Sequence, residues 1–486
     1  MTHRSPATAP GIRTLVILGA GGDLTRRLLL PGLAECLADG TPGHPVTVIG
    51  AGHGEDPGFA ATVREAFAGA LGASDRQPEA VRAAAVSARW ITADATDAGD
   101  LAGLLDQAPG PAALYFALPP SVTEEACRAL AGLDGEGRLP EDTVVVLEKP
   151  VGDGLDSARR LNRLLAGFLP EDRVVRADHF VGMPGVLALL GMRWGNRVLE
   201  PLWNRDHVER IEITYDETLG LEGRADFYDR TGAARDMIQS HLLQTMAVVM
   251  MDRPAPDGGS RGTDAAAGSP AGDLSTAGLP AAATQVLRAA RLSSGPVGTA
   301  PDGPEAPSVL RGRYTAGTVA GRRLPSYVQE EGVEASRQAE TFAQATVEVD
   351  SARWAGVPVV VRSGKAIGTP RQEIAVVFRP PEDGSTPEDA LRVGFEDHRV
   401  ELALNAGGAF DSRGTMRTVL RADLPEPALS AYGAVLRGIL TGDRSLTVSA
   451  TGAEEGWRIT EEILSAYRSG DVPLRDYEAG SSGPAA

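Results

Sequence analysis

The segment TLVILGAGGDL, residues 14–24, decides the fold that the sequence predicts. Its first five residues form a short apolar run, which is typical of a buried parallel strand. The glycine-rich turn that follows consists of Gly19, Ala20, Gly21, Gly22, Asp23 and Leu24. Helical periodicity then begins at Arg26, and backbone N–H groups at the start of such a helix can hold a pyrophosphate. Because Leu24 occupies the third glycine position of a GxGxxG pattern, a tight turn without a ligand is the alternative interpretation.

Five more apolar runs follow, with helical stretches between them. They lie at residues 45–49, 88–92, 112–118, 143–148 and 174–177. This alternation predicts a doubly wound parallel α/β sheet through about residue 180. Ligands of such sheets bind beyond the carboxyl ends of the strands. The residues His53, Pro119 and Lys149 each follow a predicted strand and are therefore candidate site positions.

The pattern changes after residue 180. Residues 208–217 alternate apolar and polar side chains, which indicates an antiparallel sheet with one covered face. Further strands are expected at residues 342–349, 357–362, 373–380 and 399–405, and helices at 235–251, 284–291, 427–440 and 452–467. The prediction is an α/β domain over residues 1–180 and an α+β domain with a large, mainly antiparallel sheet over residues 181–486. Within the second domain, composition predicts a mobile surface insertion at 254–283, and a partly frayed tail after Tyr477.

Composition limits the function. The 486 residues carry a formal net charge of −18, which argues against binding a nucleic-acid backbone. No apolar run is long enough for a membrane span, and the first 13 residues lack the apolar region of a secretory signal. Cys36 and Cys127 both lie in apolar helical patterns, so buried thiols and a cytoplasmic location are expected. The seven histidines show no metal-ligand spacing, and no metal site is expected.

Lysine is almost absent from the chain. Of 47 basic residues only two, Lys149 and Lys365, are lysines. A position that keeps lysine in such a composition is one where a compact ammonium cannot be replaced by a planar guanidinium. Survival by chance is the alternative. Both lysines follow apolar strands in loops next to glycine, which favours a functional role.

Asp178 and His179 stand side by side after the last strand of the first domain, in the segment VVRADHFVGM. A carboxylate beside an imidazole at a strand end can handle protons or hold an anion. A salt-bridged surface pair is the alternative. His241 lies near the start of the helix predicted at 235–251, where a structural role is also open.

Taken together, these motifs resemble the glucose-6-phosphate dehydrogenase family over residues 14–482. The motifs are GAGGDLTRRLLLPGL, ALPPSV, VLEKPVG, RADHFVG, WNRDHVERIEIT, EGRADFYDRTGAARDMIQSHLLQ, WAGVPVVVRSGKA and YEAGSSGP, in family order. The resemblance implies a Rossmann-type domain (1–180) that holds NADP or NAD, and a substrate-binding and dimerisation domain (181–486). It also implies a homodimer or homotetramer that oxidises the C1 hydroxyl of a hexopyranose to a lactone.

The family's functional positions carry over residue by residue. The catalytic base matches His241, and the carboxylate that orients it matches Asp178. The substrate-binding positions match Lys149, His179, Phe180, Met183, Glu217, Asp236 and Lys365. The expected cofactor-binding residues are Gly19, Ala20, Gly21, Gly22, Asp23, Leu24, His53, Pro119 and Lys149.

Two departures from the family concern specificity. The family grips the 6-phosphate with a His-Tyr pair and a later Lys, and the last two of these positions are Phe180 and Met183 here. Each lost contact is expected to weaken phosphate binding by roughly 1.5–3 kcal/mol. The same chemistry on an unphosphorylated or modified hexose is therefore one alternative, unless Arg371 restores the anion site. A non-catalytic regulatory paralogue is another.

The second departure is His53, which stands near the family's Arg for the NADP 2′-phosphate. This leaves both NADP and NAD open.

Overall fold

A computed structural model describes most of the chain. The described residues are 11–71, 77–254, 278–295, 297–298, 305–381, 386–408, 412 and 414–485. They form two compact units, called unit 1 and unit 2. Unit 1 comprises the described residues of Met1–Gly182, Ala277–Pro280 and Pro427–Glu454, and unit 2 comprises those of Met183–Thr276, Ala281–Glu426 and Glu455–Ala486. The division into a cofactor-binding part, residues 1–180, and a substrate-binding part, residues 181–486, stays a prediction.

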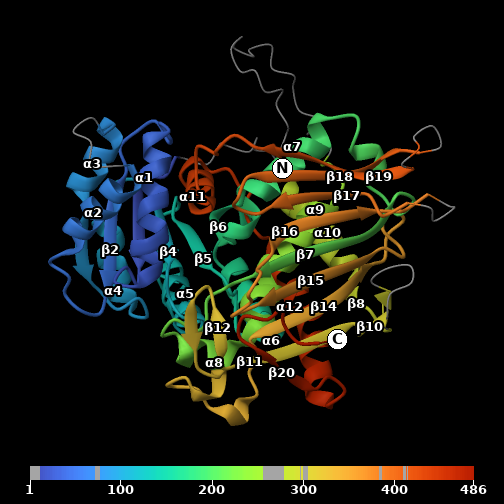
Figure 1. The fold of residues 1–486 in the computed structure, drawn as a ribbon. Helices are drawn as coiled ribbons and strands as arrows, with labels where there is room; N and C mark the ends of the chain where they lie inside the picture. The colour runs from blue at the N-terminus through green and yellow to red at the C-terminus, as the bar shows by residue number, and fades with distance from the viewer. Residues whose placement is uncertain are drawn as a thin grey trace. The chain divides into compact units, whose positions relative to one another are not determined.

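Unit 1 is built on a six-stranded parallel sheet. Its strands are β1 (Thr14–Leu18), β2 (Thr47–Gly52), β3 (Arg89–Thr92), β4 (Ala112–Phe116), β5 (Val144–Glu148) and β6 (Val174–Ala177). They are arranged in the order β3-β2-β1-β4-β5-β6, which is the order of dinucleotide-binding sheets (Figure 1). The predicted doubly wound α/β fold is thus confirmed.

Helices cover both faces of this sheet because its strands are apolar on both sides. In β1, Leu15 and Ile17 enter one hydrophobic cluster, whereas Val16 and Leu18 enter the other. The first cluster is completed by α1 (Leu30–Ala38), α2 (Phe59–Leu71), α3 (Glu79–Ser87) and α11 (Ala431–Thr441). The second is completed by α4 (Ala98–Asp106), α5 (Pro120–Gly135) and α6 (Leu155–Ala166). Cys36 and Cys127 are buried and free, and burial raises the pKa of each thiol to about 12.

The close approach of α1 and α11 depends on Gly32. A Cβ atom there would lie 2.8 Å from the backbone nitrogen of Gly433. The neighbouring Glu35 carboxylate also accepts a 2.7 Å hydrogen bond from the Ser430 N–H at the start of α11. Helix α11 therefore cannot easily move away from α1 to make room for a side chain at position 32.

We expect Gly32→Ala to destabilise the protein by about 1–3 kcal/mol, the usual cost of overpacking. The matched control is Gly103→Ala in α4, where an added Cβ meets no atom within 4 Å. That control gains up to about 1 kcal/mol from helix propensity. Urea unfolding midpoints measure both changes, and equal stability of the two variants would contradict the packing argument.

Unit 2 is built on a ten-stranded sheet. Its strands are β7 (Val208–Asp216), β8 (Ala290–Leu292), β11 (Val309–Thr315), β14 (Phe342–Val349), β15 (Pro358–Gly364), β16 (Gln372–Phe378), β17 (Ala390–Gly394), β18 (Arg399–Gly407), β19 (Thr415–Asp423) and β20 (Leu474–Glu478). The order is β19-β18-β17-β16-β7-β15-β14-β11-β20, with β8 beside β14 (Figure 1). Only β7 with β15 and β11 with β20 are parallel among these pairs of described strands. The predicted large, mainly antiparallel sheet is confirmed.

Shorter elements complete the described chain. Two small ribbons pair β9 (Val297–Gly298) with β10 (Glu305–Ala306) and β12 (Gly317–Val319) with β13 (Arg322–Leu324). The other α-helices are α7 (Pro184–Gly195), α8 (Ala225–Ala233), α9 (Leu243–Met250), α10 (Leu279–Ala289) and α12 (Ala450–Ser469). Two π-helices are η1 (Thr25–Leu29) and η5 (Ala234–Leu242). The 3₁₀ turns are η2 (Glu171–Arg173), η3 (His179–Gly182), η4 (Glu200–Leu202), η6 (Tyr327–Gln329) and η7 (Ala335–Arg337).

The predicted insertion at 254–283 falls mainly on residues 255–277, which lie outside the described residues. Helix α10 begins at Leu279, five residues before the expected start at Thr284. The run of alanines at 281–283 favours this early start, since alanine is the strongest helix former. Within the described ranges, no helix has the length and apolar character that crossing a membrane requires.

The tail after Tyr477 is not frayed as predicted. The Gly480 N–H donates to the Ala366 carbonyl at 2.8 Å, and the Ser481 carbonyl accepts from the Gly368 N–H at 2.9 Å. The Ser482 carbonyl accepts from the Arg362 guanidinium at 2.7 Å. Composition alone missed this order because the bonding partners lie more than 100 residues earlier in the chain.

Candidate active site

The glycine-rich turn of unit 1 joins β1 to the following helix through a backbone that only glycine adopts easily. Gly19 has a φ of +81°, and a Cβ there would lie 2.4 Å from the Ala117 carbonyl oxygen. The turn is fixed to β2, since the N–H groups of Gly19 and Ala20 both donate to the Ala51 carbonyl. Gly21, Gly22 and Asp23 are exposed at the start of the following helix. The N–H groups of this helix start can therefore meet an anion.

His53 follows β2 and is 76% exposed. The loop after it is held by the Trp90 indole, which donates to the Gly54 carbonyl at 2.7 Å. Asp94, after the neighbouring strand β3, has its carboxylate 3.9 Å from the His53 Nδ1. Hydrogen bonds from Thr96 lower the pKa of Asp94, so this carboxylate is ionised. Sequence reasoning missed Asp94 because only the sheet order brings it beside His53.

Lys149 follows β5, next to a buried carboxylate. The Glu148 side chain accepts hydrogen bonds from the hydroxyl of Tyr115 and from the Lys149 N–H. Burial raises the pKa of Glu148, and the hydrogen bond from Tyr115 and the charge of Lys149 oppose that shift. Tyr432 of α11 also hydrogen-bonds Glu148, and its own pKa is raised by burial. Glu148, Tyr115 and Tyr432 were not among the predicted site residues, although Glu148 precedes a predicted one.

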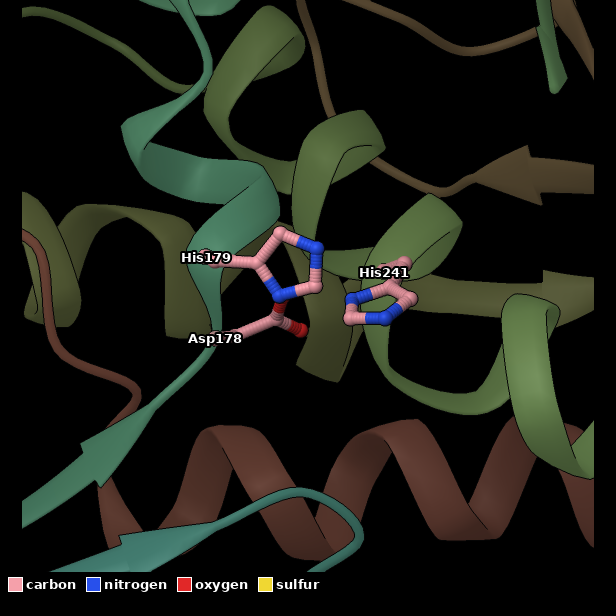
Figure 2. A group of neighbouring side chains, drawn as sticks. All are labelled: Asp178, His179 and His241. Carbon is pink, nitrogen blue, oxygen red and sulfur yellow. The ribbon is translucent and has the colours of Figure 1, made fainter. Parts of the chain in front are cut away.

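Asp178 and His179 lie where β6 ends and the short helix η3 begins (Figure 2). Asp178 is 2% exposed, and its carboxylate accepts a 3.0 Å hydrogen bond from the Phe180 N–H. The His179 ring stacks on Tyr432, with centroids 4.7 Å apart and planes 20° apart. The salt-bridged surface pair considered from the sequence is wrong for Asp178, because its carboxylate is buried.

Phe180 and Met183 are both only 2% exposed. The Phe180 ring packs on the edge of His179, with centroids 5.1 Å apart. Met183 is the residue before α7. Arg371, the possible substitute cation, instead contacts the Glu212 carboxylate at 3.4 Å.

In unit 2, Glu217 and Lys365 form an ion pair. Strands β7 and β15 are parallel neighbours, with Asp216 opposite Gly364, so the residues that follow them meet at one sheet edge. The Lys365 ammonium lies 2.5 Å from the Glu217 carboxylate and 5.1 Å from the centroid of the Tyr228 ring. Lys365 is 96% buried, since only 4% of it is exposed. Lysine is almost never fully buried unless it is paired, so the burial of Lys365 depends on its ion pair with Glu217.

His241, shown in Figure 2, and Asp236 lie on η5. This element is a π-helix rather than the ordinary α-helix that the sequence predicts. His241 is 2% exposed, and Asp236 is half-buried in the first turn. π-Helical turns are rare and occur frequently at functional sites. Hydrophobic periodicity could not reveal the wider turn, because it resembles that of an α-helix over so few residues.

A dinucleotide-type sheet with an exposed glycine turn, joined in one chain to a unit with buried histidine, lysine and carboxylates, is typical of a nucleotide-dependent dehydrogenase. Residues 16–187 match the family model "Glucose-6-phosphate dehydrogenase, NAD binding domain". Residues 190–259 and 299–486 match "Glucose-6-phosphate dehydrogenase, C-terminal domain". The chain belongs to the glucose-6-phosphate dehydrogenase family.

Relatives with known names match this chain over nearly its whole length. Glucose-6-phosphate 1-dehydrogenase of Dickeya dadantii is 32% identical, over 97% of this chain and 94% of its own length. The crystal structure of glucose-6-phosphate 1-dehydrogenase from Mycobacterium avium is 29% identical, with a TM-score of 0.76 over 98% of this chain and 95% of that chain. A structure of glucose-6-phosphate dehydrogenase in complex with its substrate glucose-6-phosphate is 25% identical, with a TM-score of 0.79 over 98% of this chain and 96% of that chain.

Proposed function

We propose that this protein oxidises the C1 hydroxyl of glucose 6-phosphate to the lactone, with NADP or NAD as hydride acceptor. The observation that carries the proposal is the family match across both parts of the chain, which includes a relative solved with glucose-6-phosphate as its substrate. An NAD(P)-binding role for residues 1–180 and a substrate-binding and dimerisation role for 181–486 are part of the same proposal.

His241 is the proposed general base, and Asp178 is the carboxylate that orients it. Taking the C1 hydroxyl proton requires a base that titrates near neutral pH, which an imidazole provides. A carboxylate holds such an imidazole in one tautomer and stabilises its protonated form. The burial of both side chains supports these roles, since electrostatic interactions are stronger away from water.

The sugar hydroxyls are the proposed ligands of Lys149, His179, Glu217, Asp236 and Lys365. The contacts of three of these residues support a preformed site. The buried ion pair between Lys365 and Glu217 holds both side chains in place before the sugar arrives. Tyr432 likewise holds the His179 ring by stacking. Preorganised polar groups lower the cost of binding.

The glycine turn from Gly19 to Leu24, together with His53, Pro119 and Lys149, is the proposed cofactor site. The bound cofactor supplies the nicotinamide that accepts hydride. The turn requires glycine at position 19, since a Cβ there would lie 2.4 Å from the Ala117 carbonyl oxygen. The exposed residues Gly21 to Asp23 at the helix start support pyrophosphate binding, because N–H groups at a helix start favour an anion. The Asp94 carboxylate beside His53 disfavours a second anion at that position, which weakens selectivity for NADP over NAD.

His53→Arg is therefore expected to raise the ratio of kcat/KM with NADP to kcat/KM with NAD by about tenfold, since one charge-assisted hydrogen bond is worth roughly 1.5–3 kcal/mol. The matched control is His207→Arg, which adds the same charge at an exposed position of unit 2. Initial rates with each cofactor give both ratios. An unchanged ratio in the His53 variant would remove this residue from the 2′-phosphate position.

A matrix of sugars and cofactors, followed by NAD(P)H absorbance, tests the proposal. The sugars are glucose 6-phosphate, glucose, and amino and deoxy hexoses, each with NADP and with NAD. The expected result is the highest kcat/KM for glucose 6-phosphate. A clear preference for an unphosphorylated sugar would replace the substrate but keep the chemistry. No NAD(P)H with any sugar would instead favour a non-catalytic paralogue.

We further propose a cytoplasmic homodimer or homotetramer. Two buried free thiols, Cys36 and Cys127, are compatible with a reducing compartment. Light scattering coupled to size-exclusion chromatography tests the assembly, and a monomer at micromolar concentration would contradict it.

A further inference from the structure

A cavity of about 340 Å³ lies within unit 2, and none of the residues proposed for sugar or cofactor binding lines it. Its wall comes from the end of α8, the start of η5, strand β11, the segment from η7 to the start of β14, and the end of α12. Five arginines line it, namely Arg230, Arg235, Arg311, Arg337 and Arg468. Two carboxylates, Asp229 and Glu340, also line it. This concentration of positive charge contrasts with the net charge of −18 on the whole chain.

The carboxylate of Asp229 is already satisfied. It accepts hydrogen bonds from the Tyr327 hydroxyl at 2.7 Å and from the Glu334 N–H at 3.0 Å. It also pairs with Arg337 at 3.3 Å. Asp229 therefore neutralises one arginine of the five.

The carboxylate of Glu340 is held by the backbone. It accepts a 2.9 Å hydrogen bond from the Ala234 N–H, and burial raises its pKa. Gly232 makes this approach possible: it has a φ of +68°, and a Cβ there would lie 2.6 Å from the Glu340 Oε1. No ion pair within 4.0 Å joins Glu340 to an arginine among the described residues.

Several arginines keep donors for a ligand. Among the described residues, Arg230 and Arg235 form no ion pair with a carboxylate. Arg311 is 8% exposed, donates to the carbonyls of Val472 and Tyr467, and lies 4.7 Å from the centroid of the Tyr467 ring. Arg468 forms an ion pair with Glu461 of its own helix at 3.3 Å, and its side chain is exposed. The cavity thus has a buried cation in its wall and exposed cations at its rim.

Tyr467 contributes an additional polar group. Its hydroxyl is buried and has no hydrogen-bond partner among the described residues. Burial raises the pKa of Tyr467, so the hydroxyl stays protonated and can donate. A buried donor without a partner costs about 1–3 kcal/mol, and an anionic oxygen would relieve that cost.

We propose that this cavity binds a small organic phosphate at a site separate from the active site. Guanidinium groups match the geometry of phosphate oxygens and bind them with two parallel hydrogen bonds. The volume of about 340 Å³ suits a compact ligand rather than a dinucleotide. The charge and the volume together therefore fit a phosphate group on a small molecule.

Isothermal titration calorimetry of the full chain with pyrophosphate and with glycerol 3-phosphate tests the proposal without requiring turnover. Saturating NADP is present throughout, so that the proposed cofactor site at the glycine turn is already filled. The wild type is expected to bind one equivalent. Arg230→Ser with Arg468→Ser is expected to weaken binding at least about tenfold, because two charge-assisted contacts are lost. The matched control is Arg288→Ser with Arg379→Ser, at two exposed arginines outside the cavity. Preference for glycerol 3-phosphate over pyrophosphate identifies an organic phosphate as the ligand.

Three results would overturn the proposal: no binding by the wild type at millimolar ligand, equal binding by the Arg230 and Arg468 variant, or an equal loss in the control variant. A rise in the KM of the wild type for the sugar when pyrophosphate or glycerol 3-phosphate is added would also overturn the proposal. The ligand would then occupy the active site. Phenylglyoxal labelling of the wild-type protein avoids any folding defect. Pyrophosphate is expected to protect Arg230 and Arg468 from modification, and the absence of protection would count against the site.

Discussion

His241→Asn is expected to lower kcat by about 10²–10⁴-fold, the usual contribution of a positioned general base. Asparagine is smaller than histidine and keeps a polar amide, so it fits the buried position on η5 without a steric clash. It cannot take a proton from the C1 hydroxyl. The loss should therefore appear in kcat, measured at saturating sugar and cofactor, with cofactor binding unchanged.

The matched control for this experiment is His207→Asn, at an exposed histidine of the same unit. It should keep wild-type kcat. Both variants should share the unfolding midpoint of the wild type. A His241 variant that turns over at the wild-type rate would remove His241 from the mechanism.

The second large effect concerns the phosphate group. Phe180→Tyr with Met183→Lys is expected to raise kcat/KM for glucose 6-phosphate by about 100-fold or more, since each of the two regained contacts is worth roughly 1.5–3 kcal/mol. Both native side chains are buried and apolar, so neither offers a donor to a phosphate. The measurement is the ratio of kcat/KM for glucose 6-phosphate to that for glucose, which cancels general effects on catalysis.

The single variant Phe180→Tyr is a second test, because it avoids any folding defect that the buried charge of Met183→Lys could cause. It should give part of the increase. Phe227→Tyr, at an exposed aromatic residue, is the control and should leave the ratio unchanged. If the double variant folds and its ratio equals that of the wild type, Phe180 and Met183 do not lie at the phosphate.

The sequence predicts the main architecture well because buried parallel strands appear as continuous apolar runs. TLVIL at 14–18 and VVVLE at 144–148 are both strands in the structure. The edge strand β20 could not be predicted in the same way. Its partner β11 lies some 160 residues earlier, and its sequence LRDYE is largely polar.

Site prediction shows the same limit. Residues such as Lys149 and Lys365 are recognised from local motifs and from the scarcity of lysine. The residues that contact the site residues cannot be recognised in this way. Tyr432 meets His179 across 253 positions in the chain, and Asp94 meets His53 only through the pairing of β2 with β3.

The most direct test of the proposed chemistry uses glucose 6-phosphate that carries deuterium at C1. The purified protein is incubated with this sugar and with NADP or NAD, and both products are analysed by mass spectrometry. Oxidation at C1 predicts a reduced cofactor that contains the deuterium and a lactone or its acid that has lost it. A sugar product that retains the deuterium, or no reduced cofactor with either nucleotide, would contradict the proposed reaction.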